Sequence, residues 1–147
     1  MVFKNENDLK IYLLEQCREA LKMAQDEIYH IINQFVKEFY RDYSPEMYER
    51  TFQLYNSLVK SDIVRIGNGY RAEVYFDYGT LEYLTGAKPS GKQVMDAAAY
   101  GEHGAYGLHV EYGRIGTSIW TDPMRILSNE AIQILKKRLI EAGIPIR

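Results

Sequence analysis

SDIVRIGNGYRAEVYFDY, residues 61–78, is the stretch that decides the fold class. Its second half has apolar or aromatic residues at every second position, with mostly polar or charged residues between them. This period of two is typical of a strand with one buried face and one exposed face. The alternating residues on the apolar face are Tyr70, Ala72, Val74 and Phe76. Because Gly67-Asn68-Gly69 is a short, glycine-rich connection, it predicts that the runs on either side pair as a β-hairpin over 58–78.

The stretch that precedes the hairpin has the period of one long helix. Residues 1–44 contain no glycine and no proline, and apolar residues recur at steps of three and four. The predicted helix covers about 7–41. Its apolar stripe, expected to be buried, comprises Leu9, Leu13, Cys17, Ala20, Leu21, Ala24, Ile28, Ile31, Ile32, Phe35 and Phe39. The opposite face, expected to be solvated, carries Glu15, Arg18, Glu19, Lys22, Asp26, Asn33 and Lys37.

A serine and an aspartate, each followed by proline, predict the starts of two further helices. Ser44-Pro45 begins a short helix that leads into the hairpin, and Asp122-Pro123 begins a C-terminal helix. Gly143 and Pro145 end that last helix within the segment 119–147. The expected architecture is therefore α+β and a single domain over 1–147. It has a long N-terminal helix, a small antiparallel sheet with a hairpin, and a C-terminal helix packed on the sheet.

A long Gly/Tyr-rich insertion separates the hairpin from the C-terminal helix. Residues 79–118 hold a short helix near 91–100 and a short strand at 108–112, but glycine is too frequent for a continuous element. Long insertions of this kind are usually functional or mobile, so we expect a mobile loop that orders against a partner. The interface hypothesis rests on Tyr100, His103, Tyr106, His109, Tyr112 and Arg114.

Composition excludes several classes of protein. The net charge is −2, with 18 basic and 20 acidic residues, so no basic surplus suggests specific nucleic-acid binding. No apolar run approaches the length of about 18 residues that spans a membrane. One cysteine, Cys17, cannot form an internal disulfide, which fits a reducing cytoplasm. The thirteen tyrosines favour interfaces with other proteins, since tyrosine joins an apolar ring to a polar tip.

Motifs for chemistry are weak throughout the chain. His103 and His109 have a spacing that matches no strong zinc pattern, and the serines lack a nucleophile-elbow context. We assign no catalytic residue, no cofactor and no metal, and expect a protein that is not an enzyme. A metal-dependent hydrolase using the two histidines remains an open alternative. Cys17 is read as a small buried hydrophobe, His30 as structural and Trp120 as a core anchor.

Three stretches together resemble the tail-completion, or head–tail joining, proteins of long-tailed bacteriophages. They are YSPEMYERTFQLYNSL at 43–58, HVEYGRIGT at 109–117, and IWTDPM with the helix that follows it. The order and spacing agree across about 43–140, with the long N-terminal helix in front.

The resemblance implies a non-enzymatic virion structural protein that assembles as a ring at the neck or tail end. It implies a homo-oligomer, for which a hexameric ring fits, with phage connector or adaptor proteins and tail-tube proteins as neighbours. The protein would be made in the bacterial host cytoplasm and located in the virion. A ring needs a different patch on each side of the subunit. The alternative is a small phage-type inhibitor or adaptor that binds a single host protein.

Overall fold

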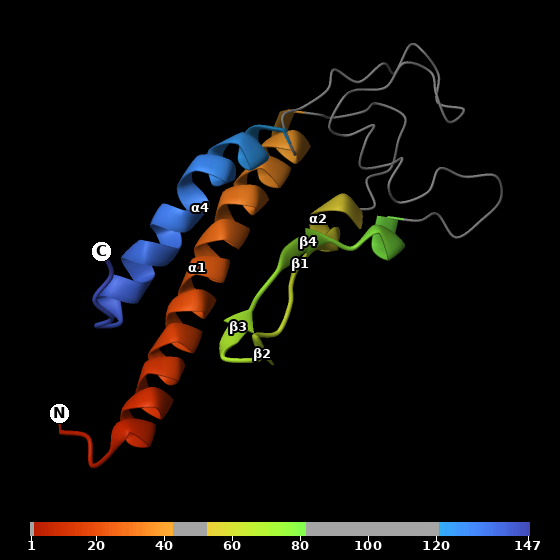
Figure 1. Cartoon of the computed structure of the whole chain (residues 1–147). Helices are drawn as coiled ribbons and strands as arrows, with labels where there is room; N and C mark the ends of the chain where they lie inside the picture. The colour runs from red at the N-terminus through yellow and green to blue at the C-terminus, as the bar shows by residue number, and fades with distance from the viewer. Residues whose placement is uncertain (1, 43–52, 82–120) are drawn as a thin grey trace, which may run out of the picture. The chain divides into compact units, whose positions relative to one another are not determined.

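The computed structural model describes residues 2–42, 53–81 and 121–147 (Figure 1). Along the chain the elements are α1 Glu6–Asp42, α2 Gln53–Ser57, β1 Leu58–Lys60, β2 Val64–Ile66, β3 Gly69–Arg71, β4 Val74–Phe76, the 3-10 helix η1 Tyr78–Leu81, and α4 Thr121–Glu141. The predicted α+β class is confirmed: a long first helix, antiparallel strands with a hairpin, and a C-terminal helix that packs on them.

The chain divides into two compact units that share α1 and the long hairpin. Unit 1 comprises Met1–Ile28, Lys60–Val74 and Leu127–Arg147. Unit 2 comprises Tyr29–Val59 and Tyr75–Ile126. The predicted short helix after Ser44-Pro45, the elements expected within 91–112, and Trp120 lie outside the described residues.

Helix α1 agrees closely with the predicted range of 7–41. It begins after Asn5, whose Oδ1 accepts a hydrogen bond of 2.9 Å from the amide of Asp8. This is an N-cap, which satisfies one of the amides left free at a helix start. Glu6 and Asp8 place negative charge in the first turn, where the helix dipole favours it.

The predicted burial of the α1 stripe is correct in the middle of the helix and wrong at its start. Ala20, Ala24 and Ile32 are buried, but Leu9 and Leu13 are 38% and 37% exposed. Asn33, expected on the solvated face, is buried. Periodicity identifies which residues share a helical face, but not how far along that face other elements reach.

Unit 1 combines the first half of α1, the β2–β3 ribbon and α4. In α4, Leu127 and Ile134 are buried on the predicted apolar face. The helix starts at Thr121, slightly before the predicted Asp122-Pro123. It ends at Glu141, and the predicted stop residue Gly143 follows with a φ of +83°. There the amides of Gly143 and Ile144 donate to the carbonyls of Ile140 and Leu139, which is a Schellman motif.

Unit 2 contains the base of the hairpin. Leu58 of β1 and Phe76 of β4 are buried, and these two strands pair. The amide of Asp77 donates to the carbonyl of Ser57 at 2.7 Å, which closes the base. The carboxylate of Asp77 then accepts from the amide of Gly79 at 3.0 Å and starts η1, which contacts α2.

Candidate interaction surface

The predicted hairpin is confirmed, but its ladder is interrupted once. β2 pairs with β3 antiparallel, with Val64 opposite Arg71 and Ile66 opposite Gly69. Below this ribbon, the amide of Ser61 donates to the carbonyl of Glu73 at 2.9 Å. Two residues, Asp62 and Ile63, therefore face one residue, Ala72. This is a β-bulge, which bends the strands and increases their twist.

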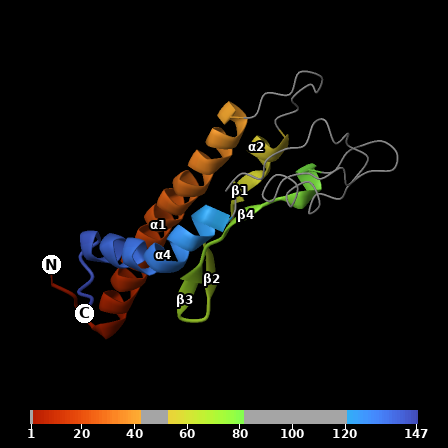
Figure 2. The same ribbon diagram turned by 90° about the horizontal axis from the view of Figure 1, so that it is seen from above.

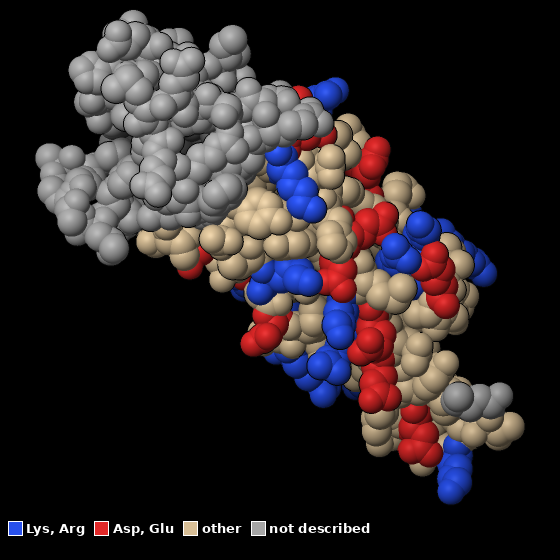
Figure 3. All heavy atoms as spheres, turned by 180° about the vertical axis from the view of Figure 1, so that it is seen from behind, with Lys and Arg blue, Asp and Glu red and all other residues tan. Residues whose placement is uncertain are grey.

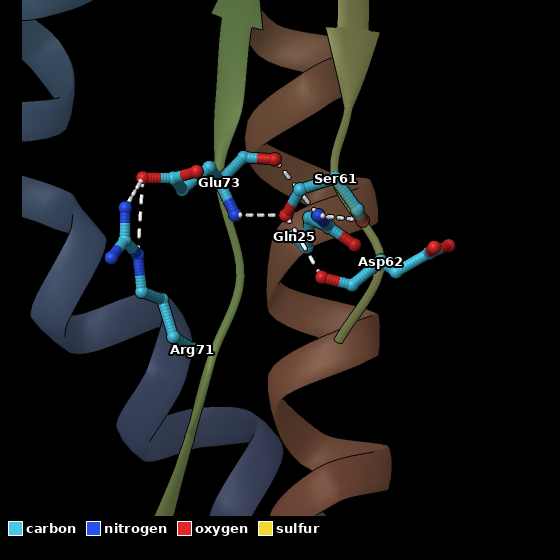
Figure 4. A network of polar contacts seen from close by, with 5 residues as sticks. All are labelled: Gln25, Ser61, Asp62, Arg71 and Glu73. Atoms are coloured by element: carbon cyan, nitrogen blue, oxygen red, sulfur yellow. Dashed lines mark hydrogen bonds and ion pairs between the residues drawn. The ribbon is translucent and has the colours of Figure 1, made fainter. Parts of the chain in front are cut away.

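Gln25 of α1 holds the hairpin at this bulge (Figure 4). Its Nε2 donates to the carbonyls of Ser61 and Glu73, at 2.9 Å each. Gln25 is only 6% exposed, so its amide replaces water for two carbonyl groups on opposite strands. The hydroxyl of Ser61 accepts from the amide of Glu73 at 2.8 Å and donates to the carbonyl of Asp62.

Exposed ion pairs flank this network. Lys60 Nζ lies 2.6 Å from Asp26 Oδ1, which gives the hairpin a second link to α1. Arg71 pairs with Glu73 along its own strand. Pairs with this exposure add little stability each, because solvent screens them. Gln25 is therefore the main polar link between helix and hairpin, and sequence reasoning missed it. The available signal was a glutamine next to Ala24, within an apolar stripe.

Helix α4 is joined to α1 by Arg138. Its guanidinium donates to Glu27 Oε2 from both Nε and Nη2, at 3.0 and 2.7 Å, and to Glu141 Oε2 from Nη1 at 2.8 Å. The hydrogen bond to Glu27, followed by that to Glu141, raises the pKa of Arg138 above its ordinary value. The side chain therefore remains charged at any pH used for a folded protein. Figure 2 shows the two helices from a second direction.

The β2–β3 ribbon presents aliphatic side chains to solvent. Val64 and Ile66 are each 52% exposed and share one face of the ribbon, since they are two residues apart. Gly69, opposite Ile66, adds no side chain to that face. We call residues 64–69 the ribbon tip. The tip begins beyond the bulge, where Gln25 fixes the hairpin on α1.

A groove lies over the first turns of α1. It has a volume of about 370 Å³ and is open to solvent. Most of its lining is apolar, and the lining residues are Glu6, Leu9, Lys10, Leu13, Leu14, Cys17 and Asn68. We call this the α1 groove. Cys17 is thus half-buried in the groove wall, and its predicted place in the core is wrong.

Charged side chains of both signs are mixed on one face of the described part of the chain. On the face in Figure 3, lysine and arginine side chains alternate with aspartate and glutamate. Within residues 2–42, 53–81 and 121–147, no helix is long and apolar enough to cross a membrane. No cluster of three or more possible metal ligands occurs in those same segments. Within these segments, exposed aliphatic side chains occur at the ribbon tip and the adjoining α1 groove, and also at Ile132 and Ile140 of α4.

The residues predicted for the interface lie elsewhere in the chain. Tyr100, His103, Tyr106, His109, Tyr112 and Arg114 all fall outside the described residues, so their role stays a prediction. His30 is described: it is exposed, and its ring lies edge-on to Tyr29 at 5.8 Å between centroids.

These features define a small α+β protein with exposed aliphatic side chains on a β-ribbon and an apolar groove on α1. The chain belongs to the YomN family, whose family model matches residues 5–141. This is a protein family of a Bacillus phage region, and membership makes the chain a phage-associated protein. No curated protein and no solved structure matches the chain.

Proposed function

We propose that this phage-associated protein is a non-enzymatic structural component of the virion. In this proposal it joins head to tail, or completes the tail, as a ring of identical subunits at the neck or tail end. Its neighbours are connector or adaptor proteins on one side and tail-tube proteins on the other. The residues Tyr100, His103, Tyr106, His109, Tyr112 and Arg114 contribute to its contacts with these partners.

The observation that carries the proposal is the apolar surface of unit 1. Val64 and Ile66 are half-exposed although nothing in the described part of the chain requires aliphatic residues there. Leu9 and Leu13 line an open groove on α1, which Asn68 of the ribbon tip also lines. Ring subunits need two different patches, one for each neighbour, and this surface can be one of them. Membership in a phage-region family and the resemblance of 43–58, 109–117 and the IWTDPM helix to head–tail joining proteins add support.

The direct test is the mass of the purified protein in solution as its concentration rises. The proposal expects a shift from the 17.1 kDa subunit to a closed oligomer, for which six subunits fit. Electron microscopy should then show rings with a central opening. A protein that stays a monomer at every concentration, and yet binds one host protein with defined stoichiometry, would instead be an inhibitor or adaptor.

The predicted interface residues have their own test. Replacing Tyr106 and Arg114 together by alanine should weaken assembly on purified connector or tail-tube protein. Replacing Tyr29, an aromatic residue of α1, by alanine serves as the comparison and should leave that assembly unchanged. Equal assembly by all three proteins would remove these two residues from the proposed interface.

A further inference from the structure

The turn of the hairpin holds an asparagine followed by a glycine, the pair that cyclises most readily in proteins. Asn68 and Gly69 form this pair, and the sequence contains no other asparagine–glycine pair. Glycine has no Cβ to hinder the approach of its amide nitrogen to the side chain before it. Asn68 is exposed, so water and hydroxide can reach it. The residue types and the exposure therefore mark Asn68 as chemically reactive.

The turn itself is short. Ile66 lies opposite Gly69, so Gly67 and Asn68 are its two central residues. Gly67 has a φ of +56°, which suits the first central position of a two-residue hairpin turn. In a closed turn the amide of the fourth residue, here Gly69, faces the carbonyl of the first, Ile66. The closed turn thus occupies the amide of Gly69, and cyclisation requires that the turn open.

Opening should be frequent because the described contacts hold the tip weakly. β2 and β3 pair over three residues each, and a two-stranded ribbon is only marginally stable by itself. Val64 and Ile66 are each 52% exposed, so they add little packing to the tip. The bonds from Gln25 reach the carbonyls of Ser61 and Glu73, at the bulge and not at the tip. Opening the end of such a ribbon costs much less free energy than unfolding the whole chain.

Asn68 also lines the α1 groove, so its modification would change a surface as well as a turn. Glu6 and Lys10 are the charged side chains of that lining, so the two signs are balanced there. A carboxylate in place of the Asn68 amide would leave the lining with an excess of negative charge. Leu9 and Leu13 beside it are apolar and partly exposed. A charge at this rim disfavours an apolar partner, because burying the charge is costly.

We propose that Asn68 is a modification site at which the chain converts itself from a neutral to an acidic form. The nitrogen of Gly69 loses its proton to hydroxide and attacks the side-chain carbonyl carbon of Asn68. The bond from that carbon to the side-chain nitrogen breaks, and the nitrogen leaves as ammonia with a proton taken from water. Water then opens the resulting succinimide ring at either carbonyl and gives aspartate or isoaspartate. The reaction consumes a water molecule, releases ammonia and needs no other reactant.

The two products differ in their effect on the tip. Aspartate keeps the path of the backbone and adds only charge. Isoaspartate passes the backbone through the former side chain, which adds a carbon atom to a turn of two central residues. The pairing of Ile66 with Gly69 is then lost, because loop length fixes the register of a hairpin. Isoaspartate at position 68 therefore loosens the tip as well as charging it.

Asn56 offers a comparison within the same chain. It is exposed like Asn68, and the residue that follows it, Ser57, is also small. Ser57 is 0% exposed, however, and its carbonyl accepts a hydrogen bond of 2.7 Å from the amide of Asp77. Freeing Ser57 thus requires the base of the hairpin to open. The fold should therefore select Asn68 for conversion and protect Asn56.

The test incubates the full chain at mildly alkaline pH and follows both asparagines by peptide mass spectrometry and ion-exchange chromatography. An acidic form should accumulate, with aspartate and isoaspartate at position 68, while Asn56 keeps its amide. In urea both asparagines should convert. Urea should accelerate the conversion of Asn68 only about tenfold, because the end of the ribbon already opens in the folded chain.

The matched variants are Gly69→Ala and Asn68→Gln. The atom nearest to a Cβ at Gly69 is the carbonyl oxygen of Ile66 at 4.0 Å, so alanine fits the turn but hinders ring closure. Gly69→Ala should slow the conversion severalfold. Asn68→Gln should abolish the acidic form, since its longer side chain closes a ring far more slowly. Asn68→Asp supplies the charge without isoaspartate, so faster amide exchange at Ile66 and Gly69 in aged protein than in this variant isolates the backbone effect.

Three results would overturn the assignment. Conversion of Asn68 in urea but not in the folded chain would mean that the turn stays closed. Equal conversion of Asn56 and Asn68 in the folded chain would mean that the fold does not select the site. An acidic form that persists in Asn68→Gln would come from another residue. None of these results depends on the oligomeric state of the chain, so the proposed ring function stands or fails separately.

Discussion

The base and the tip of one hairpin contain similar residues in opposite surroundings. At the base, Leu58 and Phe76 are buried, and the main-chain hydrogen bond from the amide of Asp77 to the carbonyl of Ser57 closes the strand pair. At the tip, Val64 and Ile66 are half-exposed although they too are aliphatic. The core of the protein explains the apolar residues of the base. Those of the tip stabilise little in the isolated chain, which is why we propose that they belong to an interface.

The bulge separates these two regions. It adds one residue to the first strand between Ser61 and Val64. Gln25 bonds both strands at that point. The same helix that buries Ala24 in the core therefore also holds the hairpin where the exposed tip begins.

The largest expected difference between base and tip is in packing. Phe76→Ala should lower the free energy of unfolding by about 3–5 kcal/mol, because it empties a buried site. Ile66→Ala should change it by less than about 0.5 kcal/mol, as is usual for exposed positions. Urea unfolding of both variants measures the two values. Similar losses would mean that the tip is part of the core, and the contrast would disappear.

Replacing Gln25, which links the hairpin to α1 between base and tip, should lower the free energy of unfolding by an intermediate amount. Gln25→Leu keeps the volume of the side chain but leaves the carbonyl of Ser61 without the bond from Gln25, so we expect a loss of about 2 kcal/mol. Gln34→Leu is the control, since Gln34 is exposed and bonds only weakly to Glu38 at 3.3 Å. Hydrogen exchange should also show faster exchange at the amides of Ser61 and Glu73 in Gln25→Leu. Unchanged exchange there would show that Gln25 does not hold the bulge.

The smallest expected changes in stability come from the two glycines of the tip, and they test the geometry of its turn. Gly67 has a φ of +56° and open space around it, so Gly67→Ala costs only backbone strain, about 1 kcal/mol. Gly69 has no such φ, and a Cβ there would come no closer than 4.0 Å to another atom. Gly69→Ala should therefore be neutral or stabilise by a few tenths of a kcal/mol. Thermal melts that rank these two variants in the reverse order would contradict the turn geometry.

Local sequence signals were sufficient to predict the helices and the hairpin. The uninterrupted period of three and four predicted α1 to within one residue at each end, because helix periodicity and the absence of glycine and proline act locally. Gly67 predicted the turn and Gly143 predicted the end of α4, and both glycines do adopt a positive φ. The family of the chain, in contrast, was identified by a family model that matches residues 5–141, and not by any short motif.

What the sequence determined by itself is therefore the type and order of the elements, since each depends on residues close together in the chain. The tertiary structure decided which parts of them are covered. It placed Gln25 against carbonyls 36 and 48 residues away, buried Asn33, and left Leu9, Leu13, Val64 and Ile66 exposed. Burial depends on how far a neighbouring element extends across a face, and no local sequence pattern predicts that distance. The proposed contact surface consists of residues that fit an apolar sequence pattern but are left exposed by the described part of the chain.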